Sequence, residues 1–245
     1  MNSNRILKKG TSELADILQS ETAEAVDKTN TTARAAGLVE TAANGTADDS
    51  LLENLNDGSF SALLLYNPQG KLLASTGSAD MDNLKTTSEN TEYPFRNTIL
   101  YKRLMAHLQY YTTLDISNGT PAVATAVKLF DDSGQIDVST FTGILVTIYP
   151  LGNTQEKAQN LADQGDTVLI IGNNRRYIEI NSDSGENTTL KEASENNGLS
   201  SLMDELNHDD ASDSNAPLAY TGENGRPELG WYQTTDEHMA VSVAN

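Results

Sequence analysis

The sequence of 245 residues contains no cysteine and only one tryptophan. The absence of cysteine excludes disulfide bonds, thiol nucleophiles and cysteine-ligated zinc, and it is compatible with a bacterial envelope compartment. Long apolar runs are also missing, since "ALLLY" and "GILV" are far shorter than the roughly 20 residues that span a bilayer. The first thirty residues lack the apolar centre of a signal peptide, so we expect either a cytoplasmic protein or one whose targeting segment was removed.

Basic residues are scarce. The chain has 16 Lys and Arg against 35 Asp and Glu, which gives a formal net charge of −19. Because the neutralisation of phosphates dominates nucleic-acid affinity, we expect no DNA or RNA partner. The same charge weakly disfavours a polyanionic ligand and allows a cation or a neutral amphiphile.

The common catalytic and metal-binding signatures are absent. There is no Gly-x-Ser-x-Gly elbow, no Gly-x-x-x-x-Gly-Lys phosphate loop and no His-Glu-x-x-His zinc helix. The three histidines, His107, His208 and His238, are scattered, and we interpret them as ordinary side chains rather than bases or ligands. The acidic loop "DDASDSNA" lacks the sixth-position glycine and the distal glutamate of a calcium loop. We therefore expect no enzymatic activity in this region, no metal site and no cofactor.

The chain begins with a long helical pattern. At about 100° per residue, one set of small and apolar residues falls within a stripe roughly 80° wide. The stripe comprises Leu7, Leu14, Leu18, Ala25, Thr29, Thr32, Ala36, Val39 and Ala43. It predicts one helix from about Ile6 to Ala43, roughly 55 Å long. The helix either lies along the core only or also pairs with a second copy of itself.

From residue 60 the pattern changes to the alternation that is typical of strands. "FSALLLYNPQGKLLAST" predicts a hairpin, and "YPFRNTILYKRLMAHLQYY" predicts a helix. Two further strands follow, "TPAVATAVKLF" and "FTGILVTIYPL". Helices beside antiparallel strands predict an α+β fold.

The second half repeats this scheme in smaller form. "DTVLIIGNNRRYIEIN" predicts a hairpin, "TTLKEASENNGLSSLMDEL" a short helical region, and "APLAYTGENGRPELGWYQTTDEHMAVSVAN" the closing strands. A helical connector, "GNTQEKAQNLADQG", lies between the halves. We therefore expect three parts: a long N-terminal helix (1–45), a first sheet module (46–152) and a smaller second module (153–245).

This layout resembles the double Cache sensor domain, the tandem PAS-like extracellular module of bacterial chemoreceptors, sensor histidine kinases and diguanylate cyclases. The resemblance covers nearly the whole chain. "LADQGDTVLIIGNNRRYIEIN" looks like the family's Gly-acidic-Thr start of a strand, turn and strand, with Asn173 and Asn174 where Asp-Gly is usual. "GENGRPELGWYQTTDEHMAVSVAN" looks like its closing hairpin.

The resemblance implies a membrane-distal module, a membrane-proximal module and the periplasmic side of an inner membrane. It also implies that "NRILKKG" follows a first transmembrane helix and that "MAVSVAN" precedes a second. We expect a ligand-sensing region of a receptor, whose cytoplasmic part is a kinase, a cyclase or a chemotaxis signalling domain. The alternatives are a secreted or envelope hydrolase and an adhesive surface protein. Because Ala and Thr dominate the helical stripe, we expect at most a weak homodimer through the N-terminal helix.

One stretch is suited to binding a small molecule. Four of the nine tyrosines lie between residues 93 and 111, beside two arginines and shortly before Asp115. Tyrosine provides ring surface and a hydroxyl, arginine a fork for a carboxylate, and a face of alanines leaves room for a ligand. Plain packing is the alternative for each residue. The candidate ligand residues are Tyr93, Arg96, Tyr101, Arg103, Tyr110, Tyr111, Asp115, Ala124 and Thr147.

The best-defined subfamily of these sensors binds amino acids through a tyrosine, an Arg-x-Trp-Tyr run and later aspartates. Here "NTILY" follows Arg96, and the only tryptophan, Trp231, lies in the other module. Thr147 or Ile148 stands about where the last aspartate would lie. The ligand class therefore stays open.

Overall fold

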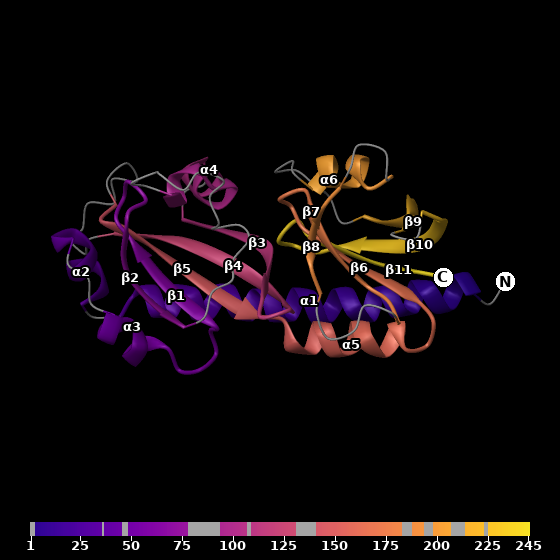
Figure 1. Ribbon diagram of the computed structural model, residues 1–245, viewed down its shortest axis with the longest axis horizontal. Coiled ribbons are helices and arrows are strands. Elements are labelled where there is room, and N and C mark those ends of the chain that lie inside the picture. Colours follow the sequence, from indigo (N-terminus) through magenta and orange to yellow (C-terminus); the bar gives the residue numbers. More distant parts are fainter. Residues whose placement is uncertain are drawn as a thin grey trace. The chain divides into compact units, whose positions relative to one another are not determined.

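The computed structural model describes residues 3–35, 37–45, 49–77, 94–106, 109–130, 141–182, 188–193, 198–206, 214–222 and 225–245. They form helices and two antiparallel sheets (Figure 1), so the predicted α+β fold with two sheet modules is confirmed. The chain divides into two compact units, which we name after their sheets. The six-stranded unit comprises Met1–Ala23, Gly119–Pro121 and Leu151–Asn245, and the five-stranded unit comprises Glu24–Asn118 and Ala122–Pro150. The predicted three-part division at residues 45 and 152 stays a prediction.

The elements follow one another in two groups. The first group contains α1 (Ser3–Ala33), α2 (Leu38–Asn44), α3 (Asp49–Leu55), β1 (Ala62–Tyr66), β2 (Leu72–Gly77), the 3₁₀ helix η1 (Pro94–Asn97), α4 (Ile99–Ala106), β3 (Tyr110–Ser117), β4 (Thr120–Leu129) and β5 (Gly143–Pro150). The second contains α5 (Gly152–Ala162), β6 (Thr167–Ile171), β7 (Arg176–Ile180), β8 (Leu190–Glu192), α6 (Ser200–Leu206), β9 (Asn215–Thr221), β10 (Pro227–Thr234) and β11 (Ala240–Ala244).

The five-stranded sheet has the strand order β2-β1-β5-β4-β3 and buries side chains on both faces. Successive side chains of a strand point to opposite faces, so each strand contributes to both layers. The layer that includes η1 and α4, which we call the α4 face, contains Ala62, Leu64, Tyr66, Phe95, Leu100, Leu104, Ala122, Ala124, Ala126, Ile144, Val146 and Ile148. The opposite layer, the α1 face, contains Ala33, Leu38, Ala42, Leu52, Phe60, Leu63, Leu65, Leu73, Ala74, Val127, Leu129 and Leu145.

The long helix α1 ends earlier than the sequence pattern predicts. It stops at Ala33, and a separate helix, α2, starts at Leu38. Between them Gly37 has a φ of 87°, a left-handed conformation that glycine adopts without steric cost and that interrupts a helix. The stripe itself is correct up to that point, because Leu14, Leu18 and Ala25 are fully buried.

Threonine hydroxyls on α1 are satisfied within the helix. The Oγ1 atoms of Thr11, Thr22, Thr29 and Thr32 each donate a hydrogen bond to the backbone carbonyl four residues earlier. Buried hydroxyls therefore cost α1 little. This explains how a helix so rich in threonine can pack its stripe in the interior.

The six-stranded sheet has the strand order β8-β7-β6-β11-β10-β9. Its final strand in sequence, β11, is paired with β6 on one side and with β10 on the other. The face that packs against α6, which we call the α6 face, contains Leu169, Ile171, Tyr177, Leu199, Leu202, Met203, Leu206, Leu218, Tyr220, Ala240 and Ala244.

Two further segments differ from the predicted secondary structure. Tyr110 and Tyr111 begin the strand β3 instead of ending a helix, and residues 190–192 form β8 before α6 begins. In β3 the two threonines that follow the tyrosines favour a strand, because β-branched side chains fit an extended backbone. The turn after β3 places Asn118 and Gly119 at positive φ, which suits a tight hairpin between β3 and β4.

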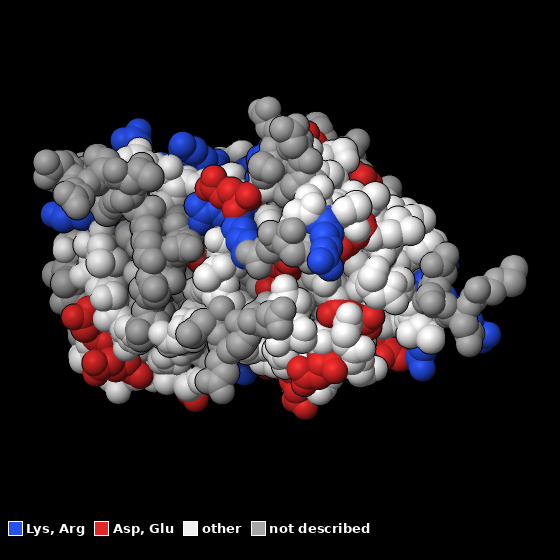
Figure 2. Space-filling view, turned by 45° about the vertical axis from the view of Figure 1, so that its right-hand side comes forward, with Lys and Arg blue, Asp and Glu red and all other residues white. Residues whose placement is uncertain are grey.

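Charged side chains of both signs reach the surface of the molecule. On the face shown in Figure 2, acidic side chains lie in several separate groups, with basic side chains between them. No broad basic patch of described residues is seen on that face. Among the described residues, no helix is both long and apolar enough to span a membrane.

Candidate ligand-binding site

The strand β3 carries a row of polar side chains on the α4 face. The hydroxyls of Thr112 and Thr125 lie 3.0 Å apart, and Lys128 N donates to Gln109 O. These two contacts imply one register for the β3–β4 hairpin, in which Asp115 lies opposite Ala122. By alternation, Tyr111, Thr113, Asp115 and Ser117 then share the α4 face with the alanines of β4.

These polar side chains are buried. Thr113 and Asp115 are 0% exposed, and Ser117 is 3% exposed. The carboxylate atom Oδ1 of Asp115 accepts a hydrogen bond of 2.8 Å from Ile116 N. Burying a carboxylate costs free energy unless hydrogen bonds or opposite charge compensate it, so a buried aspartate in a row of hydroxyls is a functional-site candidate.

The sheet curves strongly at the end that holds Asp115. Ser117 Oγ donates to Ser61 Oγ over 2.9 Å, although β5 and β4 lie between β1 and β3 in the sheet. In a flat sheet three strand spacings would separate them by about 14 Å. The bond therefore brings the β1 and β3 ends of the sheet together, two residues from Asp115.

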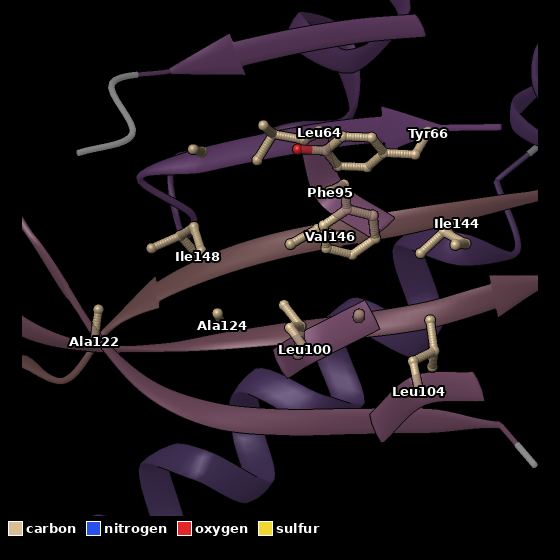
Figure 3. Close-up of a cluster of buried hydrophobic side chains, with 12 residues drawn as sticks. Leu64, Tyr66, Phe95, Leu100, Leu104, Ala122, Ala124, Ile144, Val146 and Ile148 are labelled. Carbon is tan, nitrogen blue, oxygen red and sulfur yellow. The ribbon is translucent and has the colours of Figure 1, made fainter. Parts of the chain in front are cut away.

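Small residues line the sheet next to the polar row. Ala122, Ala124 and Ala126 are all fully buried, and Ala62 adds a fourth methyl group from β1. In Figure 3, Ala122 and Ala124 present only short side chains, whereas Leu100 and Leu104 reach over the sheet from α4. Small side chains beside polar groups are the combination that a small-molecule site requires.

Three aromatic rings form one group at the other end of this layer. The rings of Tyr66 and Phe95 are stacked with centroids 4.2 Å apart, as Figure 3 shows for their side chains. Tyr101 meets Phe95 edge-on, and its hydroxyl donates to Pro68 O over 3.0 Å. Burial raises the pKa of Tyr66, so its hydroxyl stays protonated at neutral pH.

A lysine also faces this layer. Lys128 is 8% exposed, and its ammonium lies 5.6 Å from the ring centroid of Phe141. Burial lowers the pKa of Lys128, because the charged form is poorly solvated there. Six residues separate it from Ala122 along β4, or about 20 Å, so Lys128 and Asp115 do not hold the two ends of one small zwitterion.

The structure brings together only some of the sequence-predicted residues. Tyr101, Tyr111, Asp115 and Ala124 share the α4 face, and Arg103 lies half-buried on α4. Arg96 lies exposed on η1. Tyr93 lies outside the described residues, as do His107 and His208.

Two candidates lie on the opposite face of the sheet. Tyr110 packs in the α1 layer, and the hydroxyl of Thr147 lies 2.6 Å from that of Thr29 on α1. The neighbouring residue Ile148 lies on the α4 face, directly opposite Ala124. An apolar side chain, and not a carboxylate, therefore faces the alanines at this point of β5.

Sequence reasoning missed Thr113, Ser117 and Lys128. The period-two pattern of "YYTTLDIS" contained the signal for the first two, since it places Thr113 and Ser117 on one side with Asp115. Assigning the two tyrosines to a helix hid this pattern. The alternation along "AVATAVK" likewise places Lys128 with the alanines.

Several solved structures of extracellular receptor domains are similar to this chain. The ligand-binding domain of the Pseudomonas aeruginosa amino-acid chemoreceptor PctC, in complex with GABA, is 13% identical with a TM-score of 0.55, over 99% of this chain and 98% of that one. That of the Campylobacter jejuni chemoreceptor Tlp3, in complex with L-valine, is 10% identical with a TM-score of 0.53, over 100% and 92%. The extracellular domain of the histidine kinase soHK1S-Z6 is 15% identical with a TM-score of 0.54, over 98% and 92%.

The chain has the double Cache fold. The similarity extends over nearly the full length of all three receptor domains, which confirms the resemblance at the level of the fold. No protein-family model matches the sequence, and no curated protein matches it. The double Cache fold thus holds the buried row of Thr113, Asp115 and Ser117 in its five-stranded unit.

Proposed function

We propose that this chain is the ligand-sensing region of a transmembrane signal-transduction receptor and has no catalytic activity of its own. The observation that carries the proposal is the buried Asp115, placed between hydroxyl side chains and a floor of alanines in a double Cache fold. Catalysis needs an activated nucleophile or an acid–base pair. The layer around Asp115 instead combines apolar walls with few polar groups, as binding sites do.

The ligand binds on the α4 face of the five-stranded unit, which is the membrane-distal module. Asp115 binds a positively charged group of the ligand, such as an ammonium, and the hydroxyls of Thr113 and Ser117 accept further hydrogen bonds from that group. Phe95 of η1 and Tyr101 of α4 cover the layer. If the ligand also has a carboxylate, Arg103 on α4 is the candidate to bind it. Ile148 distinguishes this face from the amino-acid pattern of the family and favours a ligand that is apolar at that point.

The chain acts on the periplasmic side of an inner membrane, attached through flanking helices. Self-association through α1 is weak, because the apolar side chains of its stripe are used within the chain: Leu14 and Leu18 are fully buried. Tethering to a membrane raises the local concentration and supplies the association that the isolated chain lacks. Ligand binding then favours one of two arrangements of the receptor.

A thermal-shift screen tests the proposal. The panel contains amino acids, amines, quaternary ammonium ions, carboxylates and sugars. A ligand at 100 times its dissociation constant adds about 2.7 kcal/mol to the free energy of unfolding. The proposal predicts a saturable shift with at least one class of compound, strongest for cations. An adhesive protein without a small ligand would show no shift with any class.

A further inference from the structure

The six-stranded unit contains a second row of polar side chains on its α6 face. Tyr177, Ala240 and Ala244 belong to the buried cluster of that face. By alternation, Glu179 of β7 and Ser242 of β11 point to the same side. Both are buried, with exposures of 4% for Glu179 and 0% for Ser242.

The two side chains lie in one line across the sheet. Glu179 pairs with Leu169, Leu169 pairs with Ser242, and Ser242 pairs with Tyr232. Glu179 and Ser242 are thus two strands apart, or about 10 Å. The fully buried side chain of Leu169 lies between them in this line.

The hydroxyl of Ser242 has no hydrogen-bond partner among the residues that the structure describes. A buried polar atom without a partner costs the free energy of its lost hydration, so such atoms are rare in native proteins. The neighbouring position Gly230 has no side chain, and a Cβ placed there would lie 2.9 Å from Ser242 Oγ. The buried hydroxyl of Ser242 therefore lies beside a residue without a side chain and has its hydrogen-bonding capacity unused among the described residues.

Carboxylates and tyrosine rings gather on the same face. The hydroxyl of Tyr220 donates to a carboxylate oxygen of Glu228. Burial raises the pKa of Tyr220, and the bond to Glu228 and the negative charges of Glu228 and Glu179 raise it further. Tyr177 and Tyr220 both belong to the buried cluster, and Tyr232 packs against it. Negative charge with aromatic rings is the environment that binds organic cations.

We propose that the α6 face of the six-stranded unit is a second ligand site, specific for a small organic ammonium ion. Glu179 supplies the opposite charge, the tyrosine rings contact the alkyl groups of the cation, and Ser242 makes a hydrogen bond to it. This site lies in the other unit from the one proposed for Asp115, so it exists whether or not that one does.

Isothermal titration calorimetry provides the readout, because Trp231, the only tryptophan, alternates with Gly230 and Tyr232 on β10 and so points to the opposite face of the sheet. The probes are tetramethylammonium, choline and 1,4-diaminobutane as chloride salts, titrated to about 20 mM into the full chain, a range that detects millimolar affinities. Sodium acetate and sodium chloride are the controls for anion and salt effects. At least one of the three cations is expected to give a saturable change, and neither control salt is.

Two substitutions then test the residues, and each has its own control. Glu179→Gln should weaken binding of that cation at least about tenfold, whereas Glu192→Gln, an exposed glutamate on the neighbouring strand β8, should not change it. Ser242→Ala should weaken binding while the melting temperature without probe stays the same or rises, because an unpartnered hydroxyl is removed. No saturable change with any of the three cations would overturn the proposal. So would equal effects of Glu179→Gln and Glu192→Gln, or a Ser242→Ala variant that melts lower and binds like the parent.

Discussion

The hydroxyl oxygens of Thr29 and Thr147 lie 2.6 Å apart, joining the helix α1 to the strand β5 in the interior of the five-stranded unit. The contact lies on the face of the sheet opposite to Asp115. A side chain that bonds α1 there is a packing residue, and its loss should affect stability rather than ligand affinity.

The Thr147→Val variant therefore tests whether this face of the sheet contributes to stability and not to ligand binding. Valine has nearly the same shape and removes only the hydroxyl, so the free energy of unfolding should fall by about 1 kcal/mol. Thr29 keeps its bond to Ala25 O in this single variant. Because each single change removes the same bond between Thr29 and Thr147, the double variant with Thr29→Val should lose less than the sum of the two single changes. Urea denaturation measures these values. A ligand affinity reduced tenfold in Thr147→Val would instead return this residue to the binding site.

Glu21 caps a helix from a distant part of the sequence. The N-cap residue of α5 is Leu151, whose side chain cannot accept hydrogen bonds from the first backbone N–H groups of the helix. Glu21 of α1 accepts these hydrogen bonds instead. Its carboxylate accepts bonds from Asn153 N, Thr154 N and Thr154 Oγ1, over 2.9, 2.8 and 2.7 Å. Because these donors surround the positive end of α5, Glu21→Ala should lower the free energy of unfolding by about 2 to 3 kcal/mol.

Glu13 is the matched control for Glu21. It also lies on α1, but its side chain is 43% exposed and forms ion pairs with Lys9 and Lys157. Surface ion pairs contribute about 0 to 1 kcal/mol, so Glu13→Ala should be much milder in the same denaturant titration. Equal losses from both changes would show that the cap contributes no more than a surface contact.

The acidic residue before β6 should make stability depend on pH. Burial raises the pKa of Asp166 above its ordinary value of 3.8. The folded state therefore holds a proton that the unfolded state releases, and stability falls as the pH rises from 3.8 through the raised value. The Asp166→Asn variant has no carboxyl group to ionise, so its free energy of unfolding should rise relative to that of the parent between about pH 3 and 7. Urea denaturation of both proteins at several pH values checks this prediction. If the stability of parent and variant changed with pH in parallel, the raised pKa of Asp166 would be contradicted.

Much of the fold follows from the residue pattern alone. The short apolar runs in "ALLLY" and "KLLAST" predict β1 and β2 around the turn at residues 67–70, and "DTVLIIGNNRRYIEIN" predicts β6 and β7 in the same way. These segments are short, and local turn chemistry sets their pairing. The apolar stripe of α1 was equally readable, because a long helix repeats its contact face many times.

The site was harder to predict, because it depends on which face of a strand a residue occupies. Tyr111 satisfies helical spacing with Leu104, yet pairing of β3 with β4 outweighs that local preference. A shift of one residue moves a side chain to the other face, and this is what separates Thr147 from Ile148. The bond between Ser61 and Ser117 has no sequence signature, since it depends on curvature of the whole sheet.

Calorimetric titration of the Asp115→Asn variant tests the central claim most directly. The ligand is the compound that gives the largest shift in the thermal screen, and Arg176→Ala in the six-stranded unit is the control. If Asp115 pairs with a cationic group of this ligand, the change should weaken binding by about 2 to 5 kcal/mol while Arg176→Ala binds like the parent. Undiminished affinity in Asp115→Asn, with binding abolished in Arg176→Ala, would contradict the account and assign the ligand to the six-stranded unit.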